Sequence, residues 1–221
     1  MVKKSDLPNK MIPFNSNEKN YHQKEDIKDI ANFPSPVICI LMGNVNTGKT
    51  RTLKNILVHR SPPYERIVLY TPLETCTEYD DVDPIEIINE IPELDFFDRE
   101  MRNCFILEDI DPKNGLSKDE KTLLSRNFCV GASHNNTDIY LISQNPTDIS
   151  PVLRRVANVI FMWENNDLIQ LSHMAKKFNI LPQQLKYVFN HICKERTDSF
   201  CISDITSHAR YRKNIFEKIE I

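Results

Sequence analysis

Two glycines, a lysine and a threonine stand at a spacing that can hold the phosphates of a nucleotide. Residues 43–50 read Gly-Asn-Val-Asn-Thr-Gly-Lys-Thr, and they include two of only four glycines in a chain of 221 residues. Glycines leave room for backbone N–H groups to point at phosphate oxygens. The lysine adds a positive charge, and the threonine hydroxyl can ligate Mg²⁺. The segment predicts a P-loop, or Walker A motif, that binds ATP with Mg²⁺.

The flanking residues fit this interpretation. The apolar run 37–42 precedes the loop and indicates a buried strand, and residues 49–60 follow at helical spacing. The N-terminus of such a helix adds a favourable dipole for phosphate. The nucleotide contacts are expected from the whole loop and the residue after it, namely Gly43, Asn44, Val45, Asn46, Thr47, Gly48, Lys49, Thr50 and Arg51.

A pair of acids ends another apolar run. Residues 104–109 read Cys-Phe-Ile-Leu-Glu-Asp, which places Glu108 and Asp109 at a strand end. One acid at that position can hold Mg²⁺, and its neighbour can polarise the attacking water. We favour Glu108 with Thr50 at the metal and Asp109 near the water, with the reverse assignment left open. The alternative is a pair of solvated loop acids.

A glutamine and three arginines complete the candidate catalytic set. Gln144 ends the apolar run 138–144, where its amide could contact the γ-phosphate or the lytic water. Alternatively it is a polar residue leaving a strand. In a ring ATPase an arginine reaches the neighbouring subunit's γ-phosphate. The candidates are Arg126, Arg154 and Arg155, each of which could equally be a surface ion-pair partner.

The elements that must position these residues alternate along the chain. Apolar runs at 37–42, 66–71, 104–109, 138–144 and 159–163 are typical of strands buried on both faces. Between them, helices are expected at 49–60, 83–91, 116–128 and 150–158, the second with Asp83 as its cap and Pro84 at its first position. Helical segments at 167–178 and 182–195 and a strand at 198–205 follow. The pattern predicts an α/β fold with a mainly parallel central sheet and helices on both faces.

Composition and the chain ends set the domain organisation. Residues 1–35 lack apolar periodicity and are expected to form a polar, poorly ordered or subunit-docking arm. Residues 36–221 are expected to form one ATPase domain with a helical C-terminal part and a basic tail. No apolar run reaches the length of a membrane span, so a soluble, intracellular protein without membrane insertion is expected. The six scattered cysteines are expected to be reduced core thiols.

Two weaker patterns involve basic and metal-binding side chains. The net charge of −3 gives no global signature of nucleic-acid binding, so such binding needs a local patch. The candidates for DNA contact are Lys176, Lys177, Arg210, Tyr211, Arg212 and Lys213, with a solvated surface as the alternative. A zinc site is conceivable from His191, Cys193, Cys201 and His208, although their spacing is not that of a standard finger.

Over residues 36–216 the chain resembles the viral DNA-packaging ATPases of the FtsK–HerA superfamily, and especially the poxvirus-type packaging ATPases. The resemblance rests on "GNVNTGKT", "FILEDI", "SRNFCVGASHNNTDIYLISQNPTDISPVLRRVANVIFMW" and "DSFCISDITSHARYRKN". The strand ending in glutamine, followed by a proline–arginine helix, narrows the choice among P-loop families. Three features depart from the family: the short chain, the Glu-Asp order at 108–109, and Asn127 where a histidine often follows Arg126.

The resemblance implies a RecA-like (ASCE) P-loop NTPase that hydrolyses ATP. Such a protein is expected to form a homo-oligomeric ring at the viral capsid vertex and to package double-stranded DNA. It would act in the host-cell cytoplasm, a viral factory or the nucleus, or with the virion. The alternatives are a DNA pump or helicase of the same superfamily, a small-molecule kinase, and a non-hydrolysing assembly protein.

Overall fold

The computed structural model places a central sheet with helices around it. It describes residues 21–22, 33, 36–60, 62–72, 77–108, 116–127, 131–145, 149–164, 168–204 and 210–221. The described strands are β1 (Tyr21–His22), β2 (Ile38–Met42), β3 (Arg66–Tyr70), β4 (Val82–Asp83), β5 (Glu86–Ile88), β6 (Asn103–Leu107), β7 (Thr137–Ser143), β8 (Val159–Trp163), β9 (Ser199–Ser203), β10 (Tyr211–Lys213) and β11 (Glu217–Lys218). The described helices are α1 (Lys49–His59), η2 (Leu94–Phe96), α2 (Lys118–Arg126), α3 (Ala132–His134), α4 (Pro151–Val156), α5 (Leu168–Lys176) and α6 (Pro182–His191).

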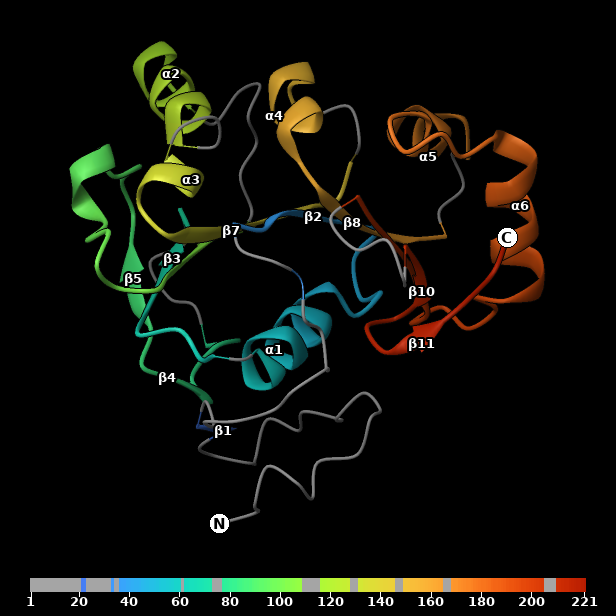
Figure 1. The fold of residues 1–221 in the computed structure, drawn as a ribbon, viewed down its shortest axis with the longest axis horizontal. Helices are drawn as coiled ribbons and strands as arrows, with labels where there is room; N and C mark the ends of the chain where they lie inside the picture. The colour runs from blue at the N-terminus through green and yellow to red at the C-terminus, as the bar shows by residue number, and fades with distance from the viewer. Residues whose placement is uncertain are drawn as a thin grey trace.

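The main sheet has nine strands in the order β11-β10-β9-β8-β2-β7-β6-β3-β5 (Figure 1). The six strands from β8 to β5 run parallel, and β9, β10 and β11 extend the sheet by antiparallel pairing. β2 lies between β7 and β8. The chain passes from β2 to β3 on the β7 side, whereas the connection from β7 through α4 reaches β8 on the other side. In parallel sheets a ligand site forms beyond the strand ends at such a switch point. The topology therefore directs attention to the loop after β2.

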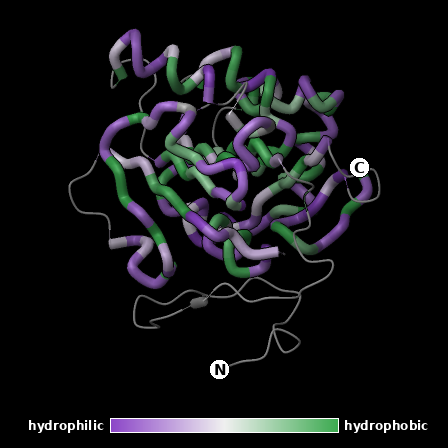
Figure 2. The backbone as a smooth tube through the Cα atoms, turned by 60° about the vertical axis from the view of Figure 1, so that its left-hand side comes forward, coloured by the Kyte–Doolittle hydropathy of each residue, from purple (hydrophilic) through white to green (hydrophobic). Residues whose placement is uncertain are grey.

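Two apolar clusters cover the two faces of the sheet. Alternate residues of β2 divide between them: Ile40 belongs to the cluster under α2, α4, α5 and α6, and Leu41 to the cluster under α1. Both residues are fully buried, as expected for strands covered on both sides. Figure 2 shows apolar residues gathered in the strands at the centre. The predicted α/β fold, mainly parallel with helices on both faces, is confirmed.

Side-chain caps mark the start of two of the expected helices. The Ser117 hydroxyl accepts a hydrogen bond from the Glu120 N–H, and the Glu120 carboxylate accepts one from the Ser117 N–H, which forms a capping box at the start of α2. Ser150 caps α4, with Pro151 at its first position. These caps fix where the two helices begin on the face opposite α1.

The predicted helix at 83–91 is wrong. Residues 82–83 form β4, which pairs with β1, and residues 86–88 form β5, which pairs in parallel with β3. Ile87 and Ile88 are β-branched and fit a pleated sheet edge, and β3 offers an open edge there. Tertiary pairing outweighs the helix signals of an aspartate followed by a proline.

Both ends of the chain contribute to the folded domain. Tyr21 pairs with Val82 at the backbone of the small β1–β4 sheet. Phe33 is buried, and its ring packs edge-on against Phe161 at a centroid distance of 6.3 Å. At the other end, the predicted basic tail includes two strands, β10 and β11. The rest of residues 1–35 lies outside the described residues.

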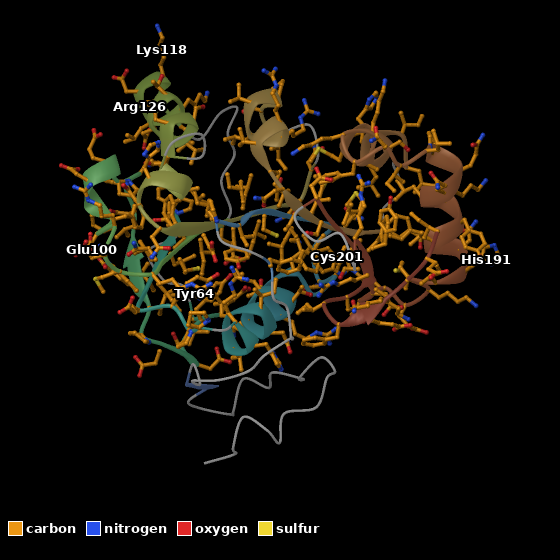
Figure 3. All side chains as sticks on the ribbon, in the orientation of Figure 1. Tyr64, Glu100, Lys118, Arg126, His191 and Cys201 are labelled. Carbon is orange, nitrogen blue, oxygen red and sulfur yellow. The ribbon has the colours of Figure 1, made fainter. Side chains whose placement is uncertain are left out.

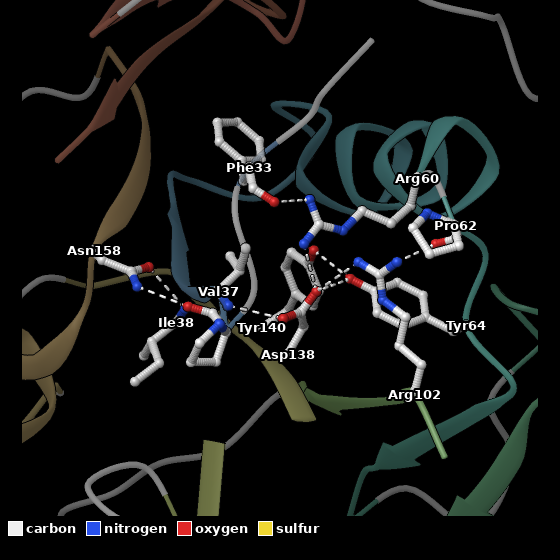
Figure 4. A network of polar contacts seen from close by, with 11 residues as sticks. Phe33, Val37, Ile38, Arg60, Pro62, Tyr64, Arg102, Asp138, Tyr140 and Asn158 are labelled. Atoms are coloured by element: carbon white, nitrogen blue, oxygen red, sulfur yellow. Dashed lines mark hydrogen bonds and ion pairs between the residues drawn. The ribbon is translucent and has the colours of Figure 1, made fainter. Parts of the chain in front are cut away.

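A buried charged network ties the strand starts together at the edge opposite the P-loop (Figure 4). Asp138, near the start of β7, accepts hydrogen bonds from the Val37 backbone at 2.8 Å and from Arg60 and the Tyr64 hydroxyl, each at 2.7 Å. Burial raises the pKa of Tyr64, which keeps its hydroxyl protonated as a donor. Burial opposes the charge on Arg60, but neighbouring Tyr64, Tyr140 and Asp138 outweigh it and raise its pKa. The network fixes the end of α1 against the start of β2.

Candidate nucleotide-binding site

The loop at residues 43–50 leaves β2, enters α1, and needs glycine at two positions. A Cβ on Gly43 would lie 2.8 Å from Thr47 Oγ1 and 2.9 Å from Trp163 Cβ, so a side chain has no room there. Gly48 has φ +97°, in the left-handed region that other residues avoid. Its carbonyl accepts the first helical hydrogen bond, from the Thr52 N–H at 2.9 Å. The two glycines of the motif therefore both have a structural reason.

Lys49 lies inside the loop. Its side chain is buried, and Nζ donates to the carbonyl oxygens of Gly43 and Asn44, each at 2.8 Å. Thr47 Oγ1 donates to the same Asn44 carbonyl at 2.9 Å. These two carbonyls hold the ammonium at the mouth of the loop. Phosphate oxygens carry negative charge, so they attract an ammonium more strongly than neutral carbonyls do.

The Thr50 hydroxyl meets two carboxylates. It lies 3.1 Å from Glu108 Oε1 and 3.1 Å from Glu78 Oε2. Glu108 follows β6, is nearly buried, and is fixed by its backbone N–H, which donates to Tyr70 O at 3.1 Å. Glu78 is exposed and comes from the loop after β3. The structure therefore brings together Thr50 and Glu108, as predicted, and adds a second acid that the sequence analysis missed.

This oxygen set fits Mg²⁺. A hydroxyl and two carboxylates are hard oxygen ligands, and the ion is commonly held by one or two carboxylates together with phosphates and waters. Thr50 and Glu108 would hold the ion, with Glu78 on its solvent side. Asp109, the other predicted acid, lies outside the described residues.

Gln144 lies at the same sheet edge. Met42 pairs with Ser143, and the Gly43 N–H donates to Ser143 O at 3.2 Å. Gln144 is the next residue, exposed to solvent beside the start of the P-loop. This placement agrees with the predicted role, whose chemistry stays a prediction.

The three predicted arginines lie elsewhere. Arg126 is exposed at the end of α2, and Figure 3 shows it high above the sheet. Arg154 is half-buried and Arg155 exposed, both on α4. Across the described ranges none of the three makes a hydrogen bond or ion pair with residues 43–50. A role on a neighbouring subunit stays a prediction for each.

A fourth arginine, which the sequence analysis did not select, reaches the P-loop. Arg196 Nη2 donates to the carbonyl of Val45 at 3.0 Å. It comes from the turn between α6 and β9, 151 residues from its partner. Only the folded arrangement of β9 beside β8 could reveal this contact.

The basic residues of the predicted DNA-binding tail are largely engaged within the domain. Arg210 pairs with Asp204 at 3.2 Å, and Lys213 pairs with Asp198 at 2.9 Å. Arg212 is buried, and its guanidinium donates to Ile215 O at 3.0 Å. These contacts assign the three cations roles in packing β10 onto the sheet.

The two candidate lysines of α5 and the turn after it differ. Lys176 is exposed. Lys177 is exposed as well, but its ammonium donates to the Ala157 carbonyl, and burial of that ammonium lowers its pKa. Tyr211 is half-buried on β10. Of these three candidates, Lys176 is the one free to meet a DNA backbone.

The conceivable zinc site does not form from the residues described. His191 lies at the outer end of α6, whereas Cys201 lies in the sheet (Figure 3). Cys193 Sγ contacts the Ser199 carbonyl at 3.5 Å, and burial raises the pKa of both thiols to about 12. Within the described ranges no group of three or more His, Cys, Asp or Glu side chains could hold a metal. His208 lies outside those ranges.

Comparison with solved structures identifies the fold. B204, the DNA-packaging ATPase from Sulfolobus turreted icosahedral virus, superposes with a TM-score of 0.56 over 84% of this chain and 99% of its own, at 12% identity. The genome-packaging NTPase B204 from Sulfolobus turreted icosahedral virus 2, in complex with ATP-γS, gives 0.54 over 84% and 98%, at 14% identity. This chain has a RecA-like P-loop NTPase fold.

The same fold occurs in other ATP-driven transport systems. The pCW3 conjugation coupling protein TcpA, with ATPγS, gives a TM-score of 0.51 over 84% of this chain and 61% of its own, at 10% identity. The type VII secretion ATPase EccC of Thermomonospora curvata gives 0.56 over 84% and 26%, at 8% identity. Neither a protein-family model nor a curated protein sequence matches the chain.

Proposed function

We propose that this protein hydrolyses ATP and uses the energy to move double-stranded DNA. The observation that carries the proposal is the Thr50 hydroxyl, 3.1 Å from Glu108 at the mouth of a loop that encloses Lys49. A lysine, a hydroxyl and a carboxylate at one strand edge are the parts that bind and hydrolyse a nucleoside triphosphate. A fold shared with DNA-packaging and conjugation ATPases supports DNA as the substrate.

Each part has a definite task in this proposal. Loop N–H groups and Lys49 bind the phosphates, while Thr50 and Glu108 hold Mg²⁺, which neutralises the charge that develops on the phosphates. Gln144 orients the attacking water or reports the loss of the γ-phosphate. Asp109 polarises that water in the favoured assignment, and Glu108 does so in the reverse one. An arginine from a neighbouring subunit completes the site.

The finer proposal is a poxvirus-type packaging motor. It is supported by the sequence resemblance over residues 36–216 and by the full-length superposition of B204. In that role a homo-oligomeric ring at the capsid vertex drives DNA into the particle, in the cytoplasm, viral factory or nucleus of the host cell or in association with the virion. DNA contacts are with the backbone, so they are independent of sequence and weakened by salt.

In the described part of the chain, no helix is long and apolar enough to cross a bilayer.

The first assay is ATP turnover by the purified full chain, with and without double-stranded DNA at low and moderate salt. Lys49→Ala removes the loop ammonium, and Lys186→Ala is the matched control on the exposed side of α6. We expect turnover that DNA stimulates, that salt suppresses, and that Lys49→Ala abolishes but Lys186→Ala preserves.

Other outcomes separate the alternatives. Turnover that needs a small phosphate acceptor and ignores DNA would support a kinase. Tight ATP binding without turnover, in the presence of DNA, would support a non-hydrolysing assembly protein. Hydrolysis stimulated by an unfolded polypeptide instead of DNA would point to the secretion branch of the fold. Each of these results would overturn the DNA motor.

A further inference from the structure

Arg196 contacts the P-loop from a turn that the fold holds in place. Its Nη2 donates to the carbonyl of Val45, in the middle of the P-loop, at 3.0 Å. Val45 itself is 55% exposed, so this part of the loop faces solvent, where a nucleotide can enter. The guanidinium therefore stands at the open side of the phosphate-binding loop.

The turn that carries Arg196 is fixed from both sides. The Asp198 N–H donates to Glu195 O at 2.8 Å, and the Glu195 N–H donates to Asp198 Oδ2 at 3.1 Å, which closes the turn. Lys213 of β10 pairs with the same Asp198 carboxylate at 2.9 Å. Hydrogen bonds at both ends restrict the backbone at position 196. The contact between Arg196 and Val45 therefore comes from a restrained turn.

Trp163 joins this turn to the P-loop. Its Nε1 donates to the Thr197 carbonyl at 3.2 Å, and its Cβ lies against Gly43, where a built Cβ would come within 2.9 Å. Trp163 is fully buried. One rigid side chain thus contacts the first residue of the loop and the residue next to Arg196, and it sets the spacing between them.

The charge of Arg196 has only a weak partner in this arrangement. Within the described part of the chain its hydrogen-bond partner is a neutral carbonyl, and the ion pairs there do not include it. A guanidinium has five donors in a fork that fits phosphate oxygens, and charged acceptors bind it more strongly than carbonyls do.

We propose that Arg196 is a catalytic arginine supplied in cis, which donates to the outer phosphate of the bound nucleoside triphosphate of its own subunit. It adds to the predicted trans arginines, and it rests on the proposed ATP site. A contact with the outer phosphate distinguishes triphosphate from diphosphate and stabilises the charge of the transition state. Because the turn sits on β9, the contact also links the nucleotide to the antiparallel end of the sheet.

The test compares Arg196→Ala, Arg196→Lys and the control Lys194→Ala, an exposed cation of the same turn. Calorimetry with ATPγS and ADP, in the presence of Mg²⁺, measures affinity without turnover. We expect Arg196→Ala to weaken ATPγS binding about tenfold or more and ADP binding by less than about twofold, because the lost contact is to the outer phosphate. Lysine should restore part of the ATPγS affinity, and Lys194→Ala should match the wild type.

Turnover gives a second, separate readout. We expect Arg196→Ala to lower kcat by about 10²-fold or more and to raise KM by about as much as the ATPγS affinity falls, because the contact is stronger in the transition state than in the ground state. Equal losses of ATPγS and ADP affinity would show a merely structural clamp and overturn the proposal, as would an unchanged variant. If the wild type binds but does not hydrolyse ATP, the motor proposal fails, while the ATPγS-to-ADP comparison still decides the role of Arg196.

Mixing variants separates cis from trans action. Arg196→Ala protomers retain an intact P-loop, and Lys49→Ala protomers retain Arg196. If Arg196 served a neighbouring subunit, mixed assemblies would regain turnover that neither variant has alone. We expect no recovery at any mixing ratio, and recovery would overturn the cis assignment.

Discussion

Replacing the buried Asp138 by asparagine should sharply destabilise the domain. The carboxylate accepts hydrogen bonds from the Val37 N–H, Arg60 and the Tyr64 hydroxyl, and the Arg60–Asp138 pair is 0% and 1% exposed. Asparagine keeps the shape but removes the charge, which leaves the Arg60 guanidinium in the interior without its counter-ion. Breaking a buried ion pair on one side costs about 3 to 5 kcal/mol.

The expected change is large enough to measure by urea unfolding. With a denaturant slope near 3 kcal/mol per M for a chain of this size, the midpoint should fall by roughly 1 to 2 M. The matched control is Asp204→Asn, in an ion pair whose side chains are each 37% exposed. Solvent screens that pair, so its loss should cost less than about 1 kcal/mol. Both variants are followed by circular dichroism at the same pH and salt.

Two results would contradict this reasoning. If Asp138→Asn and Asp204→Asn lowered the midpoint equally, burial would not govern the cost. If Asp138→Asn changed ATPγS affinity in the folded protein as much as stability, the network would not be confined to the edge opposite the P-loop. We expect affinity to stay within about twofold, since coupling between distant, separate contacts is small.

Three further predictions concern the site and the core. Gly43→Ala should abolish nucleotide binding measured by calorimetry while the far-ultraviolet spectrum stays native, because the added methyl has contacts below 3.0 Å. Glu108→Gln should lower turnover about 10²-fold or more with ATP still bound. Glu78→Gln should instead raise the Mg²⁺ concentration for half-maximal turnover about 10-fold, as outer-shell changes do. Identical effects of the two variants would refute separate roles for the two acids. Cys193 and Cys201, whose pKa burial raises to about 12, should resist iodoacetamide at pH 8 in the folded protein and react in urea, as read by mass spectrometry.

The P-loop was predictable because its chemistry depends on consecutive residues of the sequence. Gly43 and Gly48 are needed for a close approach and a left-handed backbone, and these local constraints leave a readable motif. Glu108 was predictable because the third apolar run ends at the sheet edge where the loop lies. The parallel sheet follows from the same runs, since strands buried on both faces have uniform apolar sequences.

The missed features depend on contacts between distant segments. Glu78 and Arg196 occupy loops with no motif of their own, and they reach the site only because β3 and β9 end or begin beside it. The error at residues 83–91 has the same origin. This acidic segment begins with a proline and therefore has helix signals, but its isoleucines pair with the open edge of β3. Local propensity is a weak guide where a sheet edge competes.

The edges of the sheet have a consequence for how copies of the chain can meet. In the part of the chain that the structure describes, the sheet ends at β5 and β11, which are three and two residues long. Glu86 of β5 pairs with Arg66 at 2.8 Å, and β11 consists of an exposed glutamate and lysine. Short, charged edges oppose strand addition. In the proposed ring, copies of the chain would therefore meet through helices and loops, without a shared sheet that would lock them together.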